Sequence, residues 1–167
     1  SAGQAPATVA GTFTQVSAGL LQHTCGVKSD GSVQCWGNDY SGQAPAAVAG
    51  PFTQVSAGGY HSCGRKSDGS VLCWGDNFYG QLGIGSAEES LTPSEVCVPP
   101  INVTAISTGD QHTCVVASGG AVKCWGENRS GQVGDGTTSD SIFPSDVVGL
   151  ASGVSRIAAG ARHTCAL

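Results

Sequence analysis

The stretch from His23 to Gly37 reads HTCGVKSDGSVQCWG, and it places two cysteines symmetrically about a turn sequence centred on Asp30. Glycine directly after this aspartate suits the left-handed position of a three-residue hairpin loop. In such a hairpin Cys25 faces Cys35 as a non-hydrogen-bonded pair, with the two Cα atoms about 4.5 Å apart. That separation is near the short end of the range for disulfides, so the stretch predicts a disulfide-linked β-hairpin.

The same pattern recurs along the chain. Each repeat has a Val/Ile-Ser/Ala-x-Gly segment and then His-x-Cys, and the first three continue to Cys-Trp-Gly and Gly-Gln. The first segments end at Gly19, Gly58, Gly109 and Gly160, which are 39, 51 and 51 residues apart. Periods of this length with several short strands each are typical of propeller blades.

The composition favours an all-β protein and excludes several classes. The chain has 167 residues with 26 Gly and 8 Cys, and no apolar run approaches the ~20 residues that span a bilayer. The chain has only 7 Lys+Arg but 12 Asp+Glu, and the net charge of -5 argues against nucleic acid as a partner. We expect no cofactor, no metal and no membrane insertion.

The repeats predict an organisation for the whole chain. Residues 1–7 resemble residues 40–46, so the chain begins within a repeat and its last repeat is unfinished. The longer periods come from insertions at 82–100 and 133–153, which we expect to be loops with a short extended piece. The predicted units are the end of a preceding repeat (1–12), repeat 1 (13–51), repeat 2 with an insertion (52–100), repeat 3 with an insertion (101–153) and a truncated repeat 4 (154–167).

The order of these motifs resembles the repeat of the regulator of chromosome condensation family in its cysteine-bearing form. This resemblance implies a β-propeller whose blades are four-stranded antiparallel sheets, here an incomplete ring of three full repeats plus a partial fourth. The founding member is a guanine-nucleotide exchange factor that binds chromatin. Other members are inhibitors of secreted enzymes, receptor ectodomains or scaffolds. This chain has no basic tail for chromatin, and no exchange-factor residue maps onto a specific position.

The cysteines predict three disulfides, Cys25–Cys35, Cys63–Cys73 and Cys114–Cys124, and an oxidising compartment. Metal ligation is the alternative, because a histidine lies two residues before the first cysteine of each pair. Nine residues separate the paired cysteines, whereas zinc knuckles are closer. Cys97 and Cys165 are left over. They either pair with each other, or Cys165 bonds a cysteine outside this chain.

Other candidate sites have a structural alternative. A residue that recurs in every repeat is more often architectural than catalytic, so we expect framework roles for the His-x-Cys histidines and for the three tryptophans. Asn102 and Asn128 begin N-glycosylation sequons, and Asn102 is the better candidate. Asp135 and Asp140 offer carboxylates for calcium, but the spacing of an EF-hand loop is missing.

We therefore expect a non-catalytic, secreted or cell-surface propeller segment that binds a protein partner or further copies of itself. Tyr40, Phe78 and Tyr79 lie at turn tips and are the expected contact residues. The alternative is a self-assembling filament in which the unfinished blade accepts a strand from the next copy. An exchange factor or an inhibitor of a secreted enzyme is less favoured, and no acid/base pair outside the repeats indicates an enzyme. No signal peptide is recognisable, so we expect any export signal to be removed or to lie outside this chain.

Overall fold

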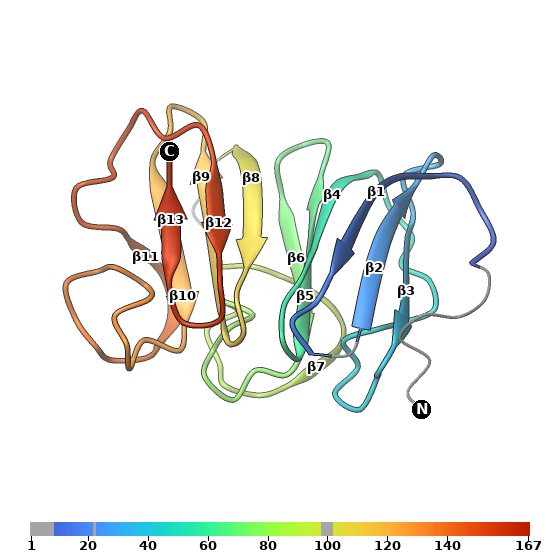
Figure 1. Cartoon of the computed structure of the whole chain (residues 1–167), viewed down its shortest axis with the longest axis horizontal. Coiled ribbons are helices and arrows are strands. Elements are labelled where there is room, and N and C mark those ends of the chain that lie inside the picture. Colours follow the sequence, from blue (N-terminus) through green and yellow to red (C-terminus); the bar gives the residue numbers. More distant parts are fainter. Residues whose placement is uncertain (1–8, 22, 98–101) are drawn as a thin grey trace.

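The chain folds into four antiparallel sheets that stand side by side without closing a ring (Figure 1). This computed structural model describes residues 9–21, 23–97 and 102–167, which contain strands but no helix. The first sheet contains β1 (Phe13–Ala18), β2 (His23–Lys28) and β3 (Val33–Gly37), and the second contains β4 (Phe52–Ala57), β5 (His61–Lys66), β6 (Val71–Gly75) and β7 (Ser90–Glu95). The third contains β8 (Val103–Thr108), β9 (His112–Ala117), β10 (Val122–Gly126) and β11 (Ser141–Asp146), and the fourth contains β12 (Ile157–Ala159) and β13 (Thr164–Ala166). The predicted all-β propeller class and its unfinished last blade are confirmed.

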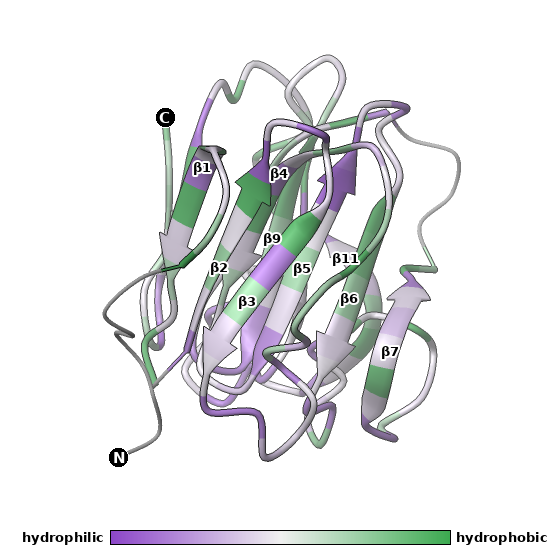
Figure 2. Cartoon of the chain, turned by 90° about the vertical axis from the view of Figure 1, so that its right-hand side faces the viewer, coloured by the Kyte–Doolittle hydropathy of each residue, from purple (hydrophilic) through white to green (hydrophobic). Residues whose placement is uncertain are grey.

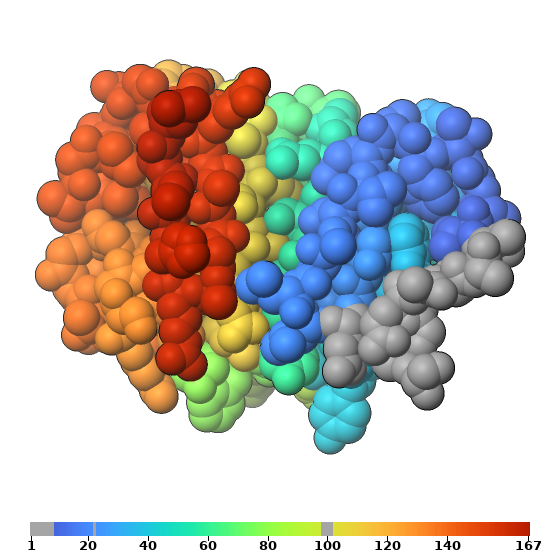
Figure 3. Space-filling view, viewed as in Figure 1, coloured from blue at the N-terminus to red at the C-terminus, as the bar shows by residue number. Residues whose placement is uncertain are grey.

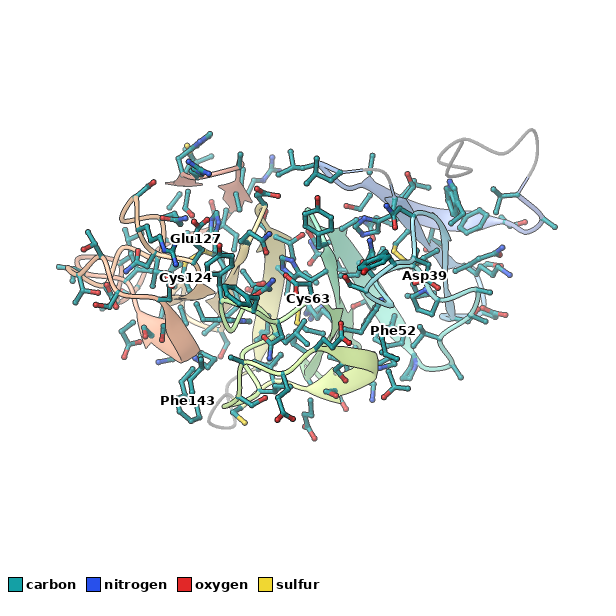
Figure 4. The ribbon with its side chains drawn as sticks, turned by 90° about the horizontal axis from the view of Figure 1, so that it is seen from below. Asp39, Phe52, Cys63, Cys124, Glu127 and Phe143 are labelled. Atoms are coloured by element: carbon teal, nitrogen blue, oxygen red, sulfur yellow. A yellow bond between two sulfur atoms is a disulfide. The ribbon has the colours of Figure 1, made fainter. Side chains whose placement is uncertain are left out.

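The first strand of each sheet lies at the inner side of the row. β1 contacts β4, β4 contacts β8, and β8 contacts β12, whereas β7 and β11 lie at the opposite side when the molecule is seen from below (Figure 4). The sheets are therefore stacked as propeller blades are, with the inner strands as neighbours and the outer strands splayed apart.

The insertions supply the fourth strand of a blade. β7 and β11 are the short extended pieces expected within residues 82–100 and 133–153, and each pairs with the strand that carries Cys-Trp-Gly. Repeat 1 has no such insertion, and an isolated bridge between Val33 and Val48 stands in place of the fourth strand. Among the described residues the second and third blades are thus four-stranded, as predicted, and the first blade has three strands. Residues 1–7, whose sequence resembles that of residues 40–46, lie outside the described part of the chain.

The central hairpin of each repeat has the predicted register. Gly31 has φ 81°, the Lys28 amide donates to the Ser32 carbonyl at 2.8 Å, and Cys25 lies opposite Cys35. The Asp30 carboxylate accepts hydrogen bonds from the amide (2.9 Å) and hydroxyl (2.6 Å) of Ser32, which fixes the loop locally. Local turn chemistry therefore determines which residues face each other across the hairpin.

All three predicted disulfides are present, and they link adjacent strands within a blade. The Cα–Cα distances are 4.0 Å for Cys25–Cys35 and 4.1 Å for both Cys63–Cys73 and Cys114–Cys124. Their sulfurs are buried, and they are disulfides rather than metal ligands. Cys97 and Cys165 are exposed and unpaired, so the alternative in which these two pair with each other is wrong.

The apolar core lies between successive blades as well as within them. Hydrophobic and hydrophilic residues alternate along β3 (Figure 2), as they do in a strand that has one buried face. Trp74 of the second blade belongs to a buried cluster with Val27 and Val33 of the first. Trp125 of the third blade belongs in the same way to a cluster with Leu82 of the second. None of the described segments forms a helix long and apolar enough to cross a membrane.

Removing one disulfide tests its contribution to stability. We expect the Cys63→Ala/Cys73→Ala double variant to lose about 3 kcal/mol of unfolding free energy, because the cross-link restricts a short loop of the unfolded chain. Urea denaturation of both proteins measures the loss. Cys97→Ala is the matched control, because this exposed thiol has no partner, and its unfolding free energy should match that of the parent. A double variant as stable as the parent would contradict the expectation.

Candidate functional site

The first three repeated histidines, His23, His61 and His112, each form part of a hydrogen-bonded link between two blades. His61 Nε2 lies 2.8 Å from the Thr113 hydroxyl of the next blade, and this hydroxyl donates to the Gln81 carbonyl at 2.8 Å. The same carbonyl accepts the indole N–H of Trp125, also at 2.8 Å. One carbonyl of the second blade thereby binds two side chains of the third. We call this set of four residues the inter-blade relay.

The relay determines which nitrogen of His61 carries the proton. Thr113 has a single hydroxyl hydrogen, and it is used toward Gln81, so His61 Nε2 must be the donor and Nδ1 is unprotonated. Burial, with smaller contributions from the neighbouring His23 and His112, lowers the pKa of His61 to about 3. Burial lowers the pKa of His112 to about 4. Both rings are therefore neutral at physiological pH and serve the framework.

The whole relay recurs at the first blade interface, and its histidine, hydroxyl and carbonyl recur at the third. His23, Ser62, Gln43 and Trp74 form the first copy, with distances of 2.9, 2.9 and 3.1 Å. In the last copy His112 bonds Thr164 at 2.9 Å, and Thr164 donates to the Gln132 carbonyl at 3.0 Å. These contacts agree with the expected framework roles of Trp74, Trp125 and the first three repeated histidines, whereas His163 is exposed. Trp36 of the first blade is only partly buried and packs edge-on against Phe13.

The Gly-Gln pair shapes the turn that follows each Cys-Trp-Gly. The side-chain oxygens of Gln43, Gln81 and Gln132 each accept a hydrogen bond from the amide two residues earlier, at 2.9 to 3.0 Å. The preceding glycines have φ between 72° and 79°, a region that glycine occupies without strain. All three turns lie on one face of the molecule, the face seen in Figure 4, where Asp39 and Glu127 mark the first and third turns.

An aromatic surface occupies this face, across the first and second blades. Tyr40, Tyr60, Phe78 and Tyr79 line a shallow cavity of about 310 Å³. Tyr40 is 93% exposed and Phe78 is 71% exposed. These four residues, which we call the aromatic patch, include all three tyrosines of the chain.

Two rings of the aromatic patch pack against each other, and neighbouring polar residues contact them or lie beneath them. The rings of Phe78 and Tyr79 pack edge to face at 4.9 Å, and the Arg129 guanidinium lies 5.1 Å from the centre of the Tyr79 ring. Beneath the patch, the Gln81 amide donates to Asp76 and Gln111 at 2.6 and 2.7 Å. The Phe78 and Tyr79 rings are therefore in contact with neighbours before any partner binds, which reduces the entropy lost when these two rings bind.

The structure brings together the predicted contact residues Tyr40, Phe78 and Tyr79 and adds Tyr60 and Arg129, which were not expected from the sequence. Tyr40, Phe78 and Arg129 occupy the same position of successive repeats, three residues after each Trp-Gly glycine. Comparison of that position between repeats is the signal that identifies Arg129. Tyr60 directly precedes a repeated histidine, on a turn that returns to the same face.

The two sequons have different surroundings. Asn102 is exposed, so its glycosylation stays a prediction. Asn128 is fully buried, and its amide donates to Thr137 and Asp135 at 3.1 Å, so the folded protein has no room for a glycan there. Asn102 thus stays the better candidate of the two, because the Asn128 side chain organises the turn before Val133 by accepting that residue's backbone N–H at 3.0 Å.

The carboxylates considered for calcium have framework partners. Asp135 accepts hydrogen bonds from Thr137 and from the side-chain amide of Asn128. Asp140 accepts one from the backbone N–H of Asn128 at 2.9 Å. Arg129 lies 3.8 Å from the other Asp140 oxygen. These contacts assign both carboxylates to the third turn, and no metal-binding cluster occurs among residues 9–21, 23–97 and 102–167.

Family models match most of the repeats found in the sequence. Two models, both described as "Regulator of chromosome condensation (RCC1) repeat", match this chain. One covers residues 13–43, 52–81 and 103–132, and the other covers residues 68–116 and 119–167. Together they include every blade of the structure.

Comparison with individual proteins also finds similarity to proteins that share this fold or sequence. The "Ultraviolet-B receptor UVR8" of Arabidopsis thaliana is 35% identical over 88 residues, which are 52% of this chain and 20% of that protein. Prp20p of Saccharomyces cerevisiae has a TM-score of 0.84 at 18% identity, covering 97% of this chain and 44% of Prp20p. The ectodomain of the Physcomitrella patens receptor kinase CR4 has a TM-score of 0.67 at 23% identity, covering 97% of this chain and 39% of the ectodomain. The chain thus spans less than half the length of each.

The buried histidines predict that acid weakens the fold. The unfolded chain binds protons below the ordinary histidine pKa of 6.5, whereas folded His61 and His112 do not bind them until about pH 3 and 4. Stability is therefore greatest above pH 6.5 and falls as the pH falls below it. Between pH 7 and 5 each histidine should contribute a loss of about 2 kcal/mol. Urea denaturation at several pH values measures this loss. His61→Gln should show a shallower pH slope, and an equal slope would contradict the assignment.

Expression in a glycosylating host tests the two sequons. We expect one N-glycan, at Asn102, because this side chain is exposed and that of Asn128 is buried. Intact-mass spectrometry of the parent and Asn102→Gln measures the difference of one glycan. A glycan that persists in Asn102→Gln would show that Asn128 is modified.

Proposed function

This chain belongs to the Regulator of chromosome condensation (RCC1) repeat family, and on that premise we propose that it is a non-catalytic extracellular scaffold that binds a partner protein through the aromatic patch. The observation that carries the proposal is the gathering of all three tyrosines and Phe78 on one exposed surface. Tyrosine and arginine are enriched among residues that dominate binding energy, and Arg129 flanks this surface.

The family supports a protein as the partner. Prp20p, the yeast propeller with the same fold, binds Gsp1p and histones. A blade framework with variable turns suits such a role, because rigid sheets hold the turns in place while the turn residues are free to differ. In this chain the varied repeat position holds Tyr40, Phe78 and Arg129 in turn.

The buried histidines support a non-catalytic role. His61 and His112 are fully buried, neutral and bonded to the next blade. A general acid or base must reach its substrate, and its pKa must lie near the working pH. Neither histidine meets these requirements, so the residues that most resemble a catalytic motif in the sequence belong to the relay.

The disulfides support an extracellular location. Three buried disulfides in a chain of this size are typical of oxidising compartments, because cytosolic thiol systems keep cysteines reduced. Each bridge also lies within a Gly-rich blade, where it compensates for the small apolar core. We infer that the protein functions outside the cell or on its surface.

Site-specific photo-crosslinking tests the aromatic patch. A benzophenone side chain placed at Tyr40 should capture a specific partner, which mass spectrometry identifies. The same probe at Phe143 is the matched control, because this aromatic is also exposed but lies at the outer edge on β11 (Figure 4). Calorimetry with the purified partner should then show that Phe78→Ala weakens binding about thirtyfold, the equivalent of about 2 kcal/mol for a central aromatic contact.

Two results would overturn the proposal. One is capture of the same partner with equal yield from position 143. The other is an unchanged dissociation constant in Phe78→Ala and Tyr40→Ala when Phe143→Ala lowers the affinity. Thermal unfolding of each variant serves as the folding control, and Tyr40 and Phe78 are sufficiently exposed that their removal should leave stability within about 0.5 kcal/mol of the parent.

A further inference from the structure

We propose that the aromatic patch is a binding site for a positively charged side chain, so that a partner contacts it with a lysine or an arginine of a basic polypeptide segment. This inference rests on the function proposed above, because it names the chemistry of the group that the same surface binds. It is carried by the charges at the surface, which the proposed function does not use.

The cavity of the aromatic patch has a negative charge in its wall. Besides the four aromatic residues, the wall consists of Ser41, Asp76 and Gln111. Asp76 is the charged residue among these seven, and it is partly exposed, so a bound partner would cover it. The Gln81 amide donates to Asp76 Oδ2 at 2.6 Å, which fixes the position of the carboxylate. The wall therefore presents one oriented negative group beside the rings.

The aromatic rings favour a ligand of the same sign. The face of a tyrosine or phenylalanine ring is the negative part of its quadrupole, and it attracts a cation that lies within about 6 Å of the ring centre. The rings of Tyr40 and Phe78 are accessible, with 93% and 71% of these residues exposed. The turn that follows β3, cyan in Figure 3, projects from the lower edge of the molecule. A cation that approaches this edge is thus attracted by both the rings and the carboxylate.

An arginine of the chain itself makes this kind of contact. The Arg129 guanidinium lies 5.1 Å from the centre of the Tyr79 ring, which is within the range of a cation–π interaction. Arg129 is not part of the cavity wall, and Asp140 lies 3.8 Å from it and balances its charge. A ring of the aromatic patch thus already binds one cation, and Arg129 does not place an uncompensated positive charge inside the cavity.

A neutral apolar partner would fit this surface less well. It would remove water from the Asp76 carboxylate and supply nothing in its place, and burying an uncompensated charge is costly. An ammonium or guanidinium group replaces the lost water and contacts the ring faces at the same time. Arginine is especially suited to both, because its planar group stacks on aromatic rings and binds carboxylates. Charge complementarity therefore favours a basic segment as the occupant.

Ring labels give a direct measure of binding at the aromatic patch. All three tyrosines of the chain belong to it, so NMR signals from carbon-13-labelled tyrosine rings report on this surface alone. Labelling the four phenylalanines as well adds Phe78 and three internal controls outside the cavity. These controls are Phe13, Phe52 and Phe143.

Two blocked peptides test the sign of the charge. One is acetyl-GGRGG-amide, and the other has citrulline in place of arginine, which keeps the shape of the side chain and removes its charge. We expect the arginine peptide to shift the tyrosine and Phe78 signals with a dissociation constant about tenfold lower than that of the citrulline peptide, because only the charged group gains from the rings and from Asp76. The signals of the three control rings should stay in place.

Removing the carboxylate should abolish most of the preference. Asp76→Asn keeps the shape and an oxygen that accepts from the Gln81 amide, but it has no charge. We expect its affinity for the arginine peptide to fall about tenfold and its affinity for the citrulline peptide to stay the same. Glu89→Gln is the matched control, because it changes the net charge equally at an exposed position outside the cavity. Neither affinity should change in Glu89→Gln.

A ring variant covers the case in which Asp76→Asn does not fold, which thermal unfolding detects. Tyr40→Leu keeps an apolar side chain and removes the ring face, and the 93% exposure of Tyr40 makes the change harmless to the fold. We expect it to lower the affinity for the arginine peptide about fivefold, and Phe143→Leu, outside the cavity, to leave it unchanged.

Several outcomes would overturn the inference. Equal dissociation constants for the two peptides would show that the surface does not recognise charge, and the proposed binding of a partner protein would still stand. The same holds for an unchanged arginine affinity in folded Asp76→Asn, or for a stronger response of the ring signals to maltose, a neutral sugar. Failure of the arginine peptide to shift the tyrosine signals, or equal shifts at Phe143, would also overturn it.

The opposite result separates the two proposals in the other direction. An arginine preference that depends on Asp76, found together with no specific capture from position 40 in the cross-linking experiment, would support the cation site. It would at the same time contradict the proposed function as a protein-binding scaffold.

Discussion

The stacking of the blades depends on a backbone carbonyl that binds two side chains of the neighbouring blade. The Gln81 carbonyl accepts hydrogen bonds from the Thr113 hydroxyl and the Trp125 indole N–H. His61, from the same blade as Gln81, donates to the Thr113 hydroxyl. Burying the carbonyl, the hydroxyl, the indole N–H and His61 Nε2 is favourable only because each of these groups finds a partner. The same contacts bring the indole into the apolar cluster between the blades. Adjacent sheets are thus held by one polar link surrounded by hydrophobic packing.

The disulfides act within a blade, and the relay acts between blades. This division explains why each of the first three repeats carries both one histidine and a pair of cysteines. A hairpin of Gly-rich strands has little surface to bury by itself, so its strands are cross-linked, and the linked hairpin then presents histidine and tryptophan to its neighbours. The side chains at the turn tips take no part in either set of contacts, so the position held by Tyr40, Phe78 and Arg129 is free to differ from repeat to repeat.

The sequence predicts those features that local chemistry determines. Asp30 and Gly31 determine the hairpin turn, and the turn determines that Cys25 faces Cys35. Features that need neighbours in space were not predictable from the sequence. Whether an insertion adds an outer strand depends on its docking against the Cys-Trp-Gly strand, as β7 does. The burial of Asn128 depends on Thr137 and Asp135, and the position of Tyr60 beside Phe78 depends on two turns converging on one face.

The relay has a direction, because each histidine reaches forward to the next blade while each tryptophan reaches back. The two sides of a blade are therefore complementary to each other, not identical. A duplicated unit inserted between two existing ones would present the correct surface to both, whereas a unit with reversed polarity would fit neither. Nearest-neighbour coupling of this vectorial kind lets such a protein lengthen through duplication of its own gene segments, with no redesign of the contacts already made.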